Sequence, residues 1–175
     1  IRRGQRYTVY PYSNGLGAHK NEEAAVRWYS KAAEQGYAQA QCTLGDCCLK
    51  GKGVEKDEKK AAECYRKAAE QNDEEAQYKL GQCYDDAVGV DRDTEKAAEW
   101  YKKSAENGNR NAQYQLGRCY YFGNGVNEKK TEAVKWYQKA AEQNHAEAQC
   151  TLGECYYWGN GVLENRGEAV KWYEK

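Results

Sequence analysis

The sequence predicts an all-α fold, an α-solenoid of stacked antiparallel helix pairs. Two series of residues, each with a 36-residue period, predict it. A Leu-Gly pair begins at Leu44, Leu80, Leu116 and Leu152. An aromatic pair begins at Trp28, Trp100, Trp136 and Trp172, and Cys64-Tyr65 takes the place of the missing member. A period of this length is typical of repeat proteins, in which each unit buries its apolar face against its neighbours.

The first half of each unit has the pattern of an amphipathic helix. In the unit at residues 38–72, Ala40, Leu44 and Cys48 recur at helical spacing, which predicts a helix at about 38–50. A glycine follows each leucine, at Gly45, Gly81, Gly117 and Gly153. Glycine inside a helix costs on the order of 1 kcal/mol relative to alanine. Its return therefore indicates that another backbone approaches closely at this position.

A glycine-rich loop follows the first helix. Gly51-Lys52-Gly53-Val54 is matched at residues 123–126 and 159–162, and more loosely at 87–90. Glycine after a helix supplies the left-handed conformation that ends it, and the valine can pack beneath the turn. A phosphate-binding loop would need a preceding strand and a Lys-Ser/Thr pair after the last glycine, and neither is visible. The glycines are therefore interpreted as helix stops.

The second half of each unit predicts another helix. The residues expected to open it are Asn21, Asp57, Asp93, Lys129 and Asn165, and all except Lys129 are good N-cap residues. Along this helix a small residue, an aromatic and another small residue share one face, as Ala133, Tyr137 and Ala140 do. Each unit closes at Gly36, Asn72, Gly108 or Asn144, which suit a helix C-terminus. Loops of about six residues within a pair and of two or three between pairs are expected.

Residues 1–20 fit the repeat poorly. Gly15–Ala18 aligns with the glycine loop, but Thr8-Val9 and Pro11 replace the features of a first helix. This segment is either a degenerate half-unit or an unrelated flanking segment, and residues 21–175 form an array of about four units, the last one truncated. Because the chain begins with Ile1, lacks methionine and stops within a unit, we expect a processed chain or part of a longer protein.

Charge and hydropathy exclude two classes of partner. Lys+Arg and Asp+Glu both number 27 and alternate along the chain, which leaves no basic surface for a nucleic acid or an anionic membrane. No apolar stretch approaches the roughly 18 to 20 residues of a membrane span, and the N-terminus lacks the apolar core of a secretory signal. We therefore expect no nucleic-acid partner and no direct membrane insertion.

The eight cysteines occupy packing positions. Cys47, Cys83, Cys119 and Cys155 share one place in the unit, Cys42 and Cys150 stand where other units have Tyr78 and Tyr114, and Cys64 replaces a tryptophan. Such placement is typical of buried free thiols, with disulfides and a metal site as alternatives. No C-x-x-C pair occurs, and the two histidines, His19 and His145, are interpreted as exposed polar residues. We expect no metal, no cofactor and no catalytic group, and a cytoplasmic location is favoured.

The first half of the repeat unit has the pattern A-x-x-x-L-G-x-x-Y-x-x-G-x-G-V, and the second half has the pattern K-A-x-x-W-Y-x-K-A-A-E. The repeat unit closely resembles the Sel-1-like repeat, a relative of the tetratricopeptide repeat. The resemblance covers about residues 21–175. It is carried in the third unit by Ala112, Leu116, Gly117, Tyr120, Gly123, Gly125, Val126, Ala133, Trp136, Tyr137 and residues 139–142. It implies a right-handed superhelix and a non-catalytic scaffold or adaptor, for example in signalling, since the family shares no catalytic residue.

One branch of that family supplies the alternative function. The cysteine-rich proteins of Helicobacter are credited with β-lactam binding or hydrolysis and carry a disulfide in each unit. The matching pairs of positions here are Ala33 and Gln41, Ala69 and Gln77, Ala105 and Gln113, and Ala141 and Gln149. None of these is cysteine, so an interaction scaffold is the function we expect. A secreted β-lactam-binding or β-lactamase-like enzyme is the alternative.

The likeness to tetratricopeptide repeats implies that the first helices line the concave side. Steps of i, i+4 and i+7 that avoid the core positions then give Cys42, Asp46 and Leu49 in the first complete unit. The residues predicted to bind a protein or peptide partner are Tyr78, Gln82, Tyr114, Arg118, Tyr121, Phe122, Glu154, Tyr157 and Trp158. Aromatic residues and arginine are enriched at binding hot spots, so units three and four are the expected anchor. The alternative is that the tyrosines pack between neighbouring helices.

Overall fold

The computed structural model of the chain describes residues 18–175, and the interpretation of Thr8-Val9, Pro11 and the Gly15–Gly17 stretch lies outside the described residues. The described part forms helices without strands. These are α1 Ala18–Glu34, α2 Ala38–Lys50, α3 Glu58–Ala69, α4 Glu74–Asp86, α5 Thr94–Glu106, α6 Arg110–Phe122, α7 Lys130–Glu142, α8 Ala146–Trp158 and α9 Arg166–Tyr173. We refer to α2, α4, α6 and α8 as the A-helices, and to α3, α5, α7 and α9 as the B-helices.

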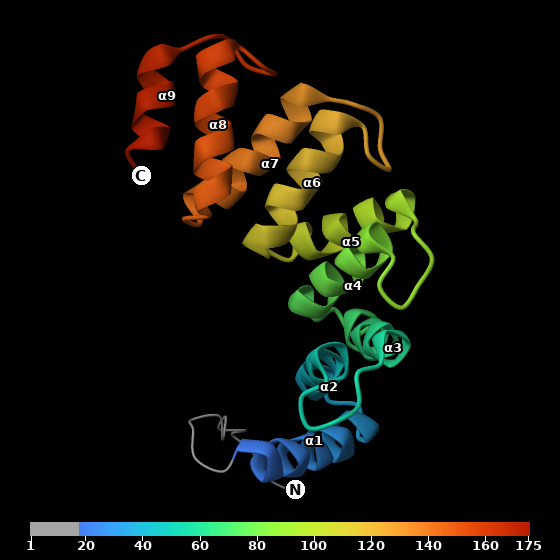
Figure 1. Cartoon of the computed structure of the whole chain (residues 1–175). Helices are drawn as coiled ribbons and strands as arrows, with labels where there is room; N and C mark the ends of the chain where they lie inside the picture. The colour runs from blue at the N-terminus through green and yellow to red at the C-terminus, as the bar shows by residue number, and fades with distance from the viewer. Residues whose placement is uncertain (1–17) are drawn as a thin grey trace, which may run out of the picture.

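The helices stack in chain order into a curved rod, from α1 at one end to α9 at the other (Figure 1). The extensive helix contacts join helices that follow one another, so each A-helix packs on the B-helix before it and on the one after it. In the described residues the apolar core is correspondingly a succession of three clusters, in α2–α4, α5–α6 and α7–α9, built mainly from alanine with cysteine, leucine and tyrosine. The predicted solenoid of antiparallel pairs with a 36-residue repeat is confirmed.

The A-helices have the predicted bounds, and their glycine has a different partner from the one expected. A Cβ added at Gly117 would lie 2.6 Å from two ring carbons of Tyr137, whereas the nearest backbone atom, the Ala133 carbonyl oxygen, lies at 3.2 Å. Gly45, Gly81 and Gly153 face Tyr65, Tyr101 and Tyr173 in the same way. The glycine therefore makes room for the tyrosine ring of its own pair, because that ring fills the space between the two helices.

The glycine-rich loops end the A-helices as predicted. Gly51, Gly123 and Gly159 are left-handed C-caps, and Ala87 adopts the same conformation with φ 58°. The second glycine of the loop has a further role, because a Cβ at Gly125 would overlap the carbonyl of Thr94 in the preceding pair. The loop thus rests on the first turn of the B-helix before it, and the repeat joins successive pairs here as well as through its helices.

Four of the five expected openings of the second helix are correct. Asp57, Asp93 and Asn165 accept hydrogen bonds from the backbone N–H groups of Lys60, Lys96 and Glu168. Lys129 occupies the same place before α7 without a side-chain cap. Asn21 was wrong as an N-cap, because α1 begins at Ala18. Alanine, the strongest helix former, stands there in place of the loop valine of the later units. In the part of the chain described, no helix has the length and apolar character needed to cross a membrane.

Candidate functional site

Two of the predicted binding residues, Tyr78 and Tyr114, lie half-buried against the B-helix of their own pair. The Tyr78 ring lies 6.1 Å from that of Tyr101, and the Tyr114 ring lies 5.7 Å from that of Tyr137. The Gln82 side chain donates to the Tyr78 hydroxyl at 2.9 Å. These tyrosines therefore pack between neighbouring helices and are only partly exposed.

The other predicted aromatic residues gather at the C-terminal ends of α6 and α8. Phe122 is 59% exposed, Trp158 69% and Tyr157 37%, while Tyr121 is half-buried. The rings form two edge-to-face pairs, with Tyr121 4.9 Å from Phe122 and Tyr157 4.7 Å from Trp158. Arg118 and Glu154, one turn earlier on the same helices, are exposed as well. The structure thus brings five of the nine predicted residues to the surface around these two helix ends.

The last residue of each A-helix offers an internal comparison. These residues, which we call the terminal row, are Lys50, Asp86, Phe122 and Trp158. All four are exposed, and each precedes a left-handed cap of the same geometry. Since a lysine and an aspartate hold this place in the first two pairs, packing does not require an aromatic side chain there. Phe122 and Trp158 are exposed apolar residues without a structural reason.

Leu163, in the loop before α9, is 90% exposed and was missed from the sequence. The equivalent positions in the earlier loops hold Glu55, Asp91 and Asn127, all of which are exposed. Comparison of the repeats could have identified Leu163, because an apolar residue at a position that is polar in the other units indicates a role specific to that unit. In the fourth pair, an exposed leucine therefore accompanies Tyr157 and Trp158.

The corresponding face of the first two pairs is polar and internally paired. The Tyr65 hydroxyl donates to the Asp46 carboxylate at 2.7 Å, and the Lys79 ammonium group lies 2.7 Å from the same carboxylate. Lys79 also approaches Glu75 at 3.6 Å. Cys42, expected on the exposed inner face, is only 1% exposed, because α4 of the next pair packs over it. Cys150, at the same place in the last pair, is exposed.

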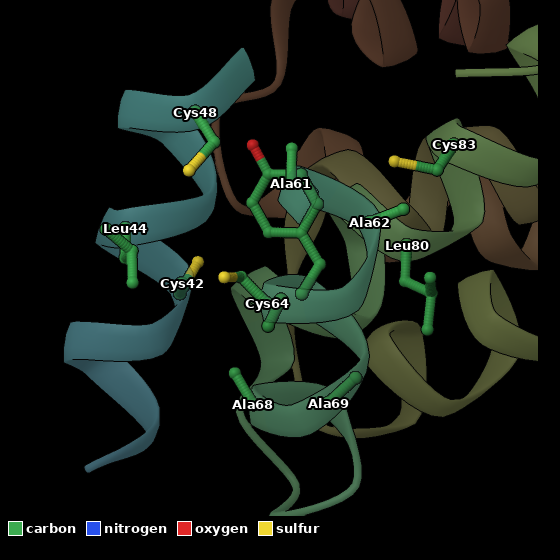
Figure 2. Close-up of a cluster of buried hydrophobic side chains, with 12 residues drawn as sticks. Cys42, Leu44, Cys48, Ala61, Ala62, Cys64, Ala68, Ala69, Leu80 and Cys83 are labelled. Carbon is green, nitrogen blue, oxygen red and sulfur yellow. The ribbon is translucent and has the colours of Figure 1, made fainter. Parts of the chain in front are cut away.

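The cysteines behave as packing residues. Figure 2 shows Cys42, Cys48 and Cys64 among leucine and alanine side chains between α2 and α3. All eight are free and six are buried. Burial raises the pKa of Cys42 to about 12 and the pKa of Cys64, Cys83, Cys119 and Cys155 to about 11. These thiols are protonated at neutral pH and are poor nucleophiles. The described residues contain no group of three or more histidine, cysteine or acidic side chains placed to hold a metal ion.

His145 was wrongly interpreted as exposed. It is 9% exposed and caps α8, accepting the backbone N–H of Ala148 on Nδ1 at 3.2 Å. Its ring lies 4.8 Å from that of Tyr114. Asp73 and Asn109 cap α4 and α6 from the equivalent position, so the histidine has taken over a structural role. Burial lowers the pKa of His145, which keeps the ring neutral and its nitrogen free to accept.

Glutamine side chains connect the pairs at the positions that the cysteine-rich branch would bridge with sulfur. The side-chain amides of Gln41, Gln77, Gln113 and Gln149 donate to the carbonyls of Ala33, Ala69, Ala105 and Ala141 at 3.1 to 3.2 Å. Three of them also accept a hydrogen bond from the end of the next B-helix, from Gln71, Asn107 and Gln143. We call these four residues the junction glutamines. All four donate to the carbonyl at a helix end, and Gln41, Gln77 and Gln113 connect three successive helices.

The Sel1 repeat family model matches the chain over residues 10–37, 38–73, 74–109, 110–145 and 146–175. The first match begins within residues 1–20, the segment interpreted from the sequence as either a degenerate half-unit or an unrelated flanking segment. A search of curated proteins gives no match.

The comparison with solved structures agrees with the family model. A Sel1 repeat protein from Oxalobacter formigenes is 41% identical with a TM-score of 0.85, and covers 91% of this chain and 66% of its own. The protective antigen c5321 of uropathogenic Escherichia coli is 37% identical with a TM-score of 0.84, and covers 87% of this chain and 32% of its own. Cysteine-rich protein B of Helicobacter pylori is 27% identical with a TM-score of 0.60, over 77% of this chain and 97% of its own. The chain therefore spans two thirds or less of the first two proteins.

Proposed function

The chain belongs to the Sel1 repeat family, and from this premise we propose that it is a non-catalytic scaffold that binds a protein or peptide partner through its A-helices. Proteins built from Sel1 repeats generally mediate protein–protein interactions. The proposed contact surface is the concave side of the array, with its anchor at the exposed ends of α6 and α8. The predicted residues Tyr78, Gln82 and Tyr114 support this surface from beneath, because they pack between neighbouring helices.

The observation that carries the proposal is the terminal row. Phe122 and Trp158 stand exposed at a place where the first two pairs hold Lys50 and Asp86 in the same helix geometry. Exposed large aromatic side chains that no packing demands are typical of binding hot spots. Tyr121, Tyr157 and Arg118 lie beside them and add residue types that are enriched at interfaces.

The test is a double substitution, Phe122→Lys with Trp158→Lys, which gives both helices the lysine that already ends α2. Affinity capture with the wild-type chain and with the variant is compared by quantitative mass spectrometry, and proteins retained by the wild type are expected to be lost by the variant. The unfolding free energy should change by less than about 0.5 kcal/mol, as is usual for surface sites. Lys50→Ala, in the same row, is the control and should leave capture intact. Equal capture by the double variant would contradict the proposal.

The proposal does not extend to β-lactam chemistry. The positions that carry disulfides in the cysteine-rich branch are joined here by the junction glutamines, and the buried thiols are protonated. A nitrocefin hydrolysis assay checks the non-catalytic part directly. Turnover above the buffer rate would overturn it.

A further inference from the structure

The A-helix ends and the loops that follow them line one edge of the array. The four stretches, residues 49–57, 85–93, 121–129 and 157–165, hold equivalent positions in successive pairs and make up what we call the loop edge. Between the first two loops lies an open hollow of about 1160 Å³, lined by Val54–Lys60 on one side and Ala87, Gly89, Val90 and Asp91 on the other. The first two loops therefore face a common space that a bound chain can enter.

The character of the loop edge changes along the array. Residues 85–93 carry four aspartates and one arginine, whereas residues 121–129 carry one glutamate and one lysine, and residues 157–165 one glutamate. The apolar Phe122, Trp158 and Leu163 lie in the last two stretches. An acidic stretch thus borders directly on an aromatic one.

Part of the acidic charge is unpaired. Arg92 pairs with Asp85 and Lys96 with Asp93, which leaves Asp86 and Asp91 exposed, with neither a hydrogen bond nor an ion pair to their carboxylates in the described part of the chain. The cations near the aromatic rings already have acidic partners, since Lys130 lies 3.6 Å from Glu128 and Arg166 lies 3.2 Å from Glu164. Arg118 lines a small polar hollow with Asp85, and neither Arg118 nor Lys129 forms an ion pair among the described residues. The free negative charge therefore lies in the second stretch, at Asp86 and Asp91.

Resting on the proposed function, we infer that the bound partner is a peptide segment that is apolar at one end and basic at the other and lies along the loop edge. Its apolar side chains contact Phe122 and Trp158, and its lysine or arginine side chains face Asp86 and Asp91. Successive A-helices are not in extensive contact with each other, so their ends lie at least about one helix diameter, roughly 10 Å, apart. An extended peptide advances about 3.3 Å per residue, so the two apolar side chains and the first basic one are spaced at least about three residues apart.

Selection from a random 12-residue peptide display library tests the pattern. The wild-type chain is expected to enrich peptides with two apolar residues at least about three apart and a lysine or arginine at least about three residues beyond them. Asp86→Lys with Asp91→Lys should enrich aspartate or glutamate at that place instead. In fluorescence anisotropy, a peptide selected on the wild type should bind this variant about tenfold more weakly. Asp86→Lys places the residue of α2 at the end of α4, where a cation suits the helix dipole, so the fold is expected to persist.

A matched control separates local contacts from net charge. Glu70→Lys with Glu99→Lys makes the same charge change at exposed carboxylates on the B-helices and should leave peptide affinity unchanged. Unchanged affinity and consensus in the Asp86→Lys/Asp91→Lys variant would overturn this inference and leave the proposed function standing. If the wild type enriches no peptides, this inference fails, and the affinity capture decides the proposed function separately. If peptides are enriched but Phe122→Lys with Trp158→Lys does not weaken them, both fail.

Discussion

At the scale of single residues, the glycine in the middle of each A-helix sets how closely the two helices of a pair approach. Its missing side chain leaves the space into which the tyrosine ring of the B-helix fits, and in the first three pairs that ring is among the largest fully buried groups of the described residues. The pair therefore depends on one very small and one large residue, placed opposite each other. Because the contact is close-packed, it has no free space for even one added methyl group.

Gly117→Ala should lower the unfolding free energy by about 1 to 3 kcal/mol, because the added Cβ would overlap the Tyr137 ring and force it or its helix to move. Urea unfolding followed by circular dichroism measures the change. Gly167→Ala is the matched control in α9, where the nearest atom, Asn165 Oδ1, lies at 3.4 Å. There alanine should be neutral or stabilise by up to about 1 kcal/mol through helix propensity. Equal effects at both sites would show that the contact with Tyr137 is unimportant.

The His145 cap predicts a pH dependence. Burial lowers the pKa of His145 in the folded chain below its usual 6.5, while Glu147 at 3.3 Å opposes this shift and Arg110 adds to it. Above pH 6.5 the ring is neutral in both states. As the pH falls through 6.5, the unfolded chain takes up a proton that the folded chain resists, so stability is lost. His145→Asn, which copies the cap of α6, should lose less stability between pH 7 and pH 5 in urea unfolding. Identical losses would contradict a titrating cap.

At the scale of helices, the A-helices could be predicted from sequence and the start of α1 could not. Leu44, Leu80, Leu116 and Leu152 with their glycines place the core stripe, and a glycine or its alanine substitute ends each A-helix, so local signals and packing agree. For α1, the repeat alignment pointed to Asn21 as the N-cap, but the helix begins at Ala18, four residues before Glu22. The contact of Gly125 with Thr94 was not predicted, because it joins residues of different pairs.

The contacts between helices of successive pairs depend on the junction glutamines. Replacing Gln113 by leucine keeps a side chain of similar size but removes two hydrogen bonds, one to the Ala105 carbonyl and one from the Gln143 amide, both of which keep a hydrogen bond to Gly108. An intramolecular hydrogen bond contributes about 0.5 to 1.5 kcal/mol, so we expect the loss of two to cost about 1 to 3 kcal/mol in chemical unfolding. Gln138→Leu, at an exposed position of α7, is the control and should stay within about 0.5 kcal/mol. A neutral Gln113→Leu would mean that the junction needs only apolar packing.

At the scale of the whole molecule, the array is a chain of contacts between neighbours, and its stability is distributed accordingly. Repeat proteins of this kind behave as a sum of unit and interface terms. In the pair α6–α7, Val134 and Tyr137 are 4% and 1% exposed, because α8 covers them. The equivalent Val170 and Tyr173 of α9 are 52% and 49% exposed. Side chains at equivalent repeat positions therefore differ in solvent exposure according to their place in the array.

Hydrogen exchange of the 175-residue chain should reveal this difference. Amides of α9 are expected to exchange at least about tenfold faster than those of α7, since opening α9 breaks contacts on one side only. Mass spectrometry with peptic fragments resolves the two helices, whose related sequences make them a natural comparison. Equal protection in both would indicate that α9 is held by contacts beyond those described.

The candidate surface could be predicted only in part, because it depends on how the pairs lie together. Periodicity placed Phe122 and Trp158 at the rim of the first helices, and the structure leaves both exposed. It could not separate Tyr78 and Tyr114 from the core, since these residues lie at the border of the apolar stripe and the Tyr101 and Tyr137 rings of the facing B-helices partly cover them. Leu163 lies in a loop, where helical periodicity carries no information.

The junction glutamines have a geometric consequence for everything beyond them. Gln113 holds α5, α6 and the end of α7 in a fixed relation, and the other junctions repeat this arrangement. A small change of angle between two helices at one junction displaces all the helices beyond it. It therefore alters the distance that separates Asp86 and Asp91 from the aromatic residues at the ends of α6 and α8. The reach and pitch of the binding edge can therefore be retuned by exchanging a side chain that no ligand ever touches.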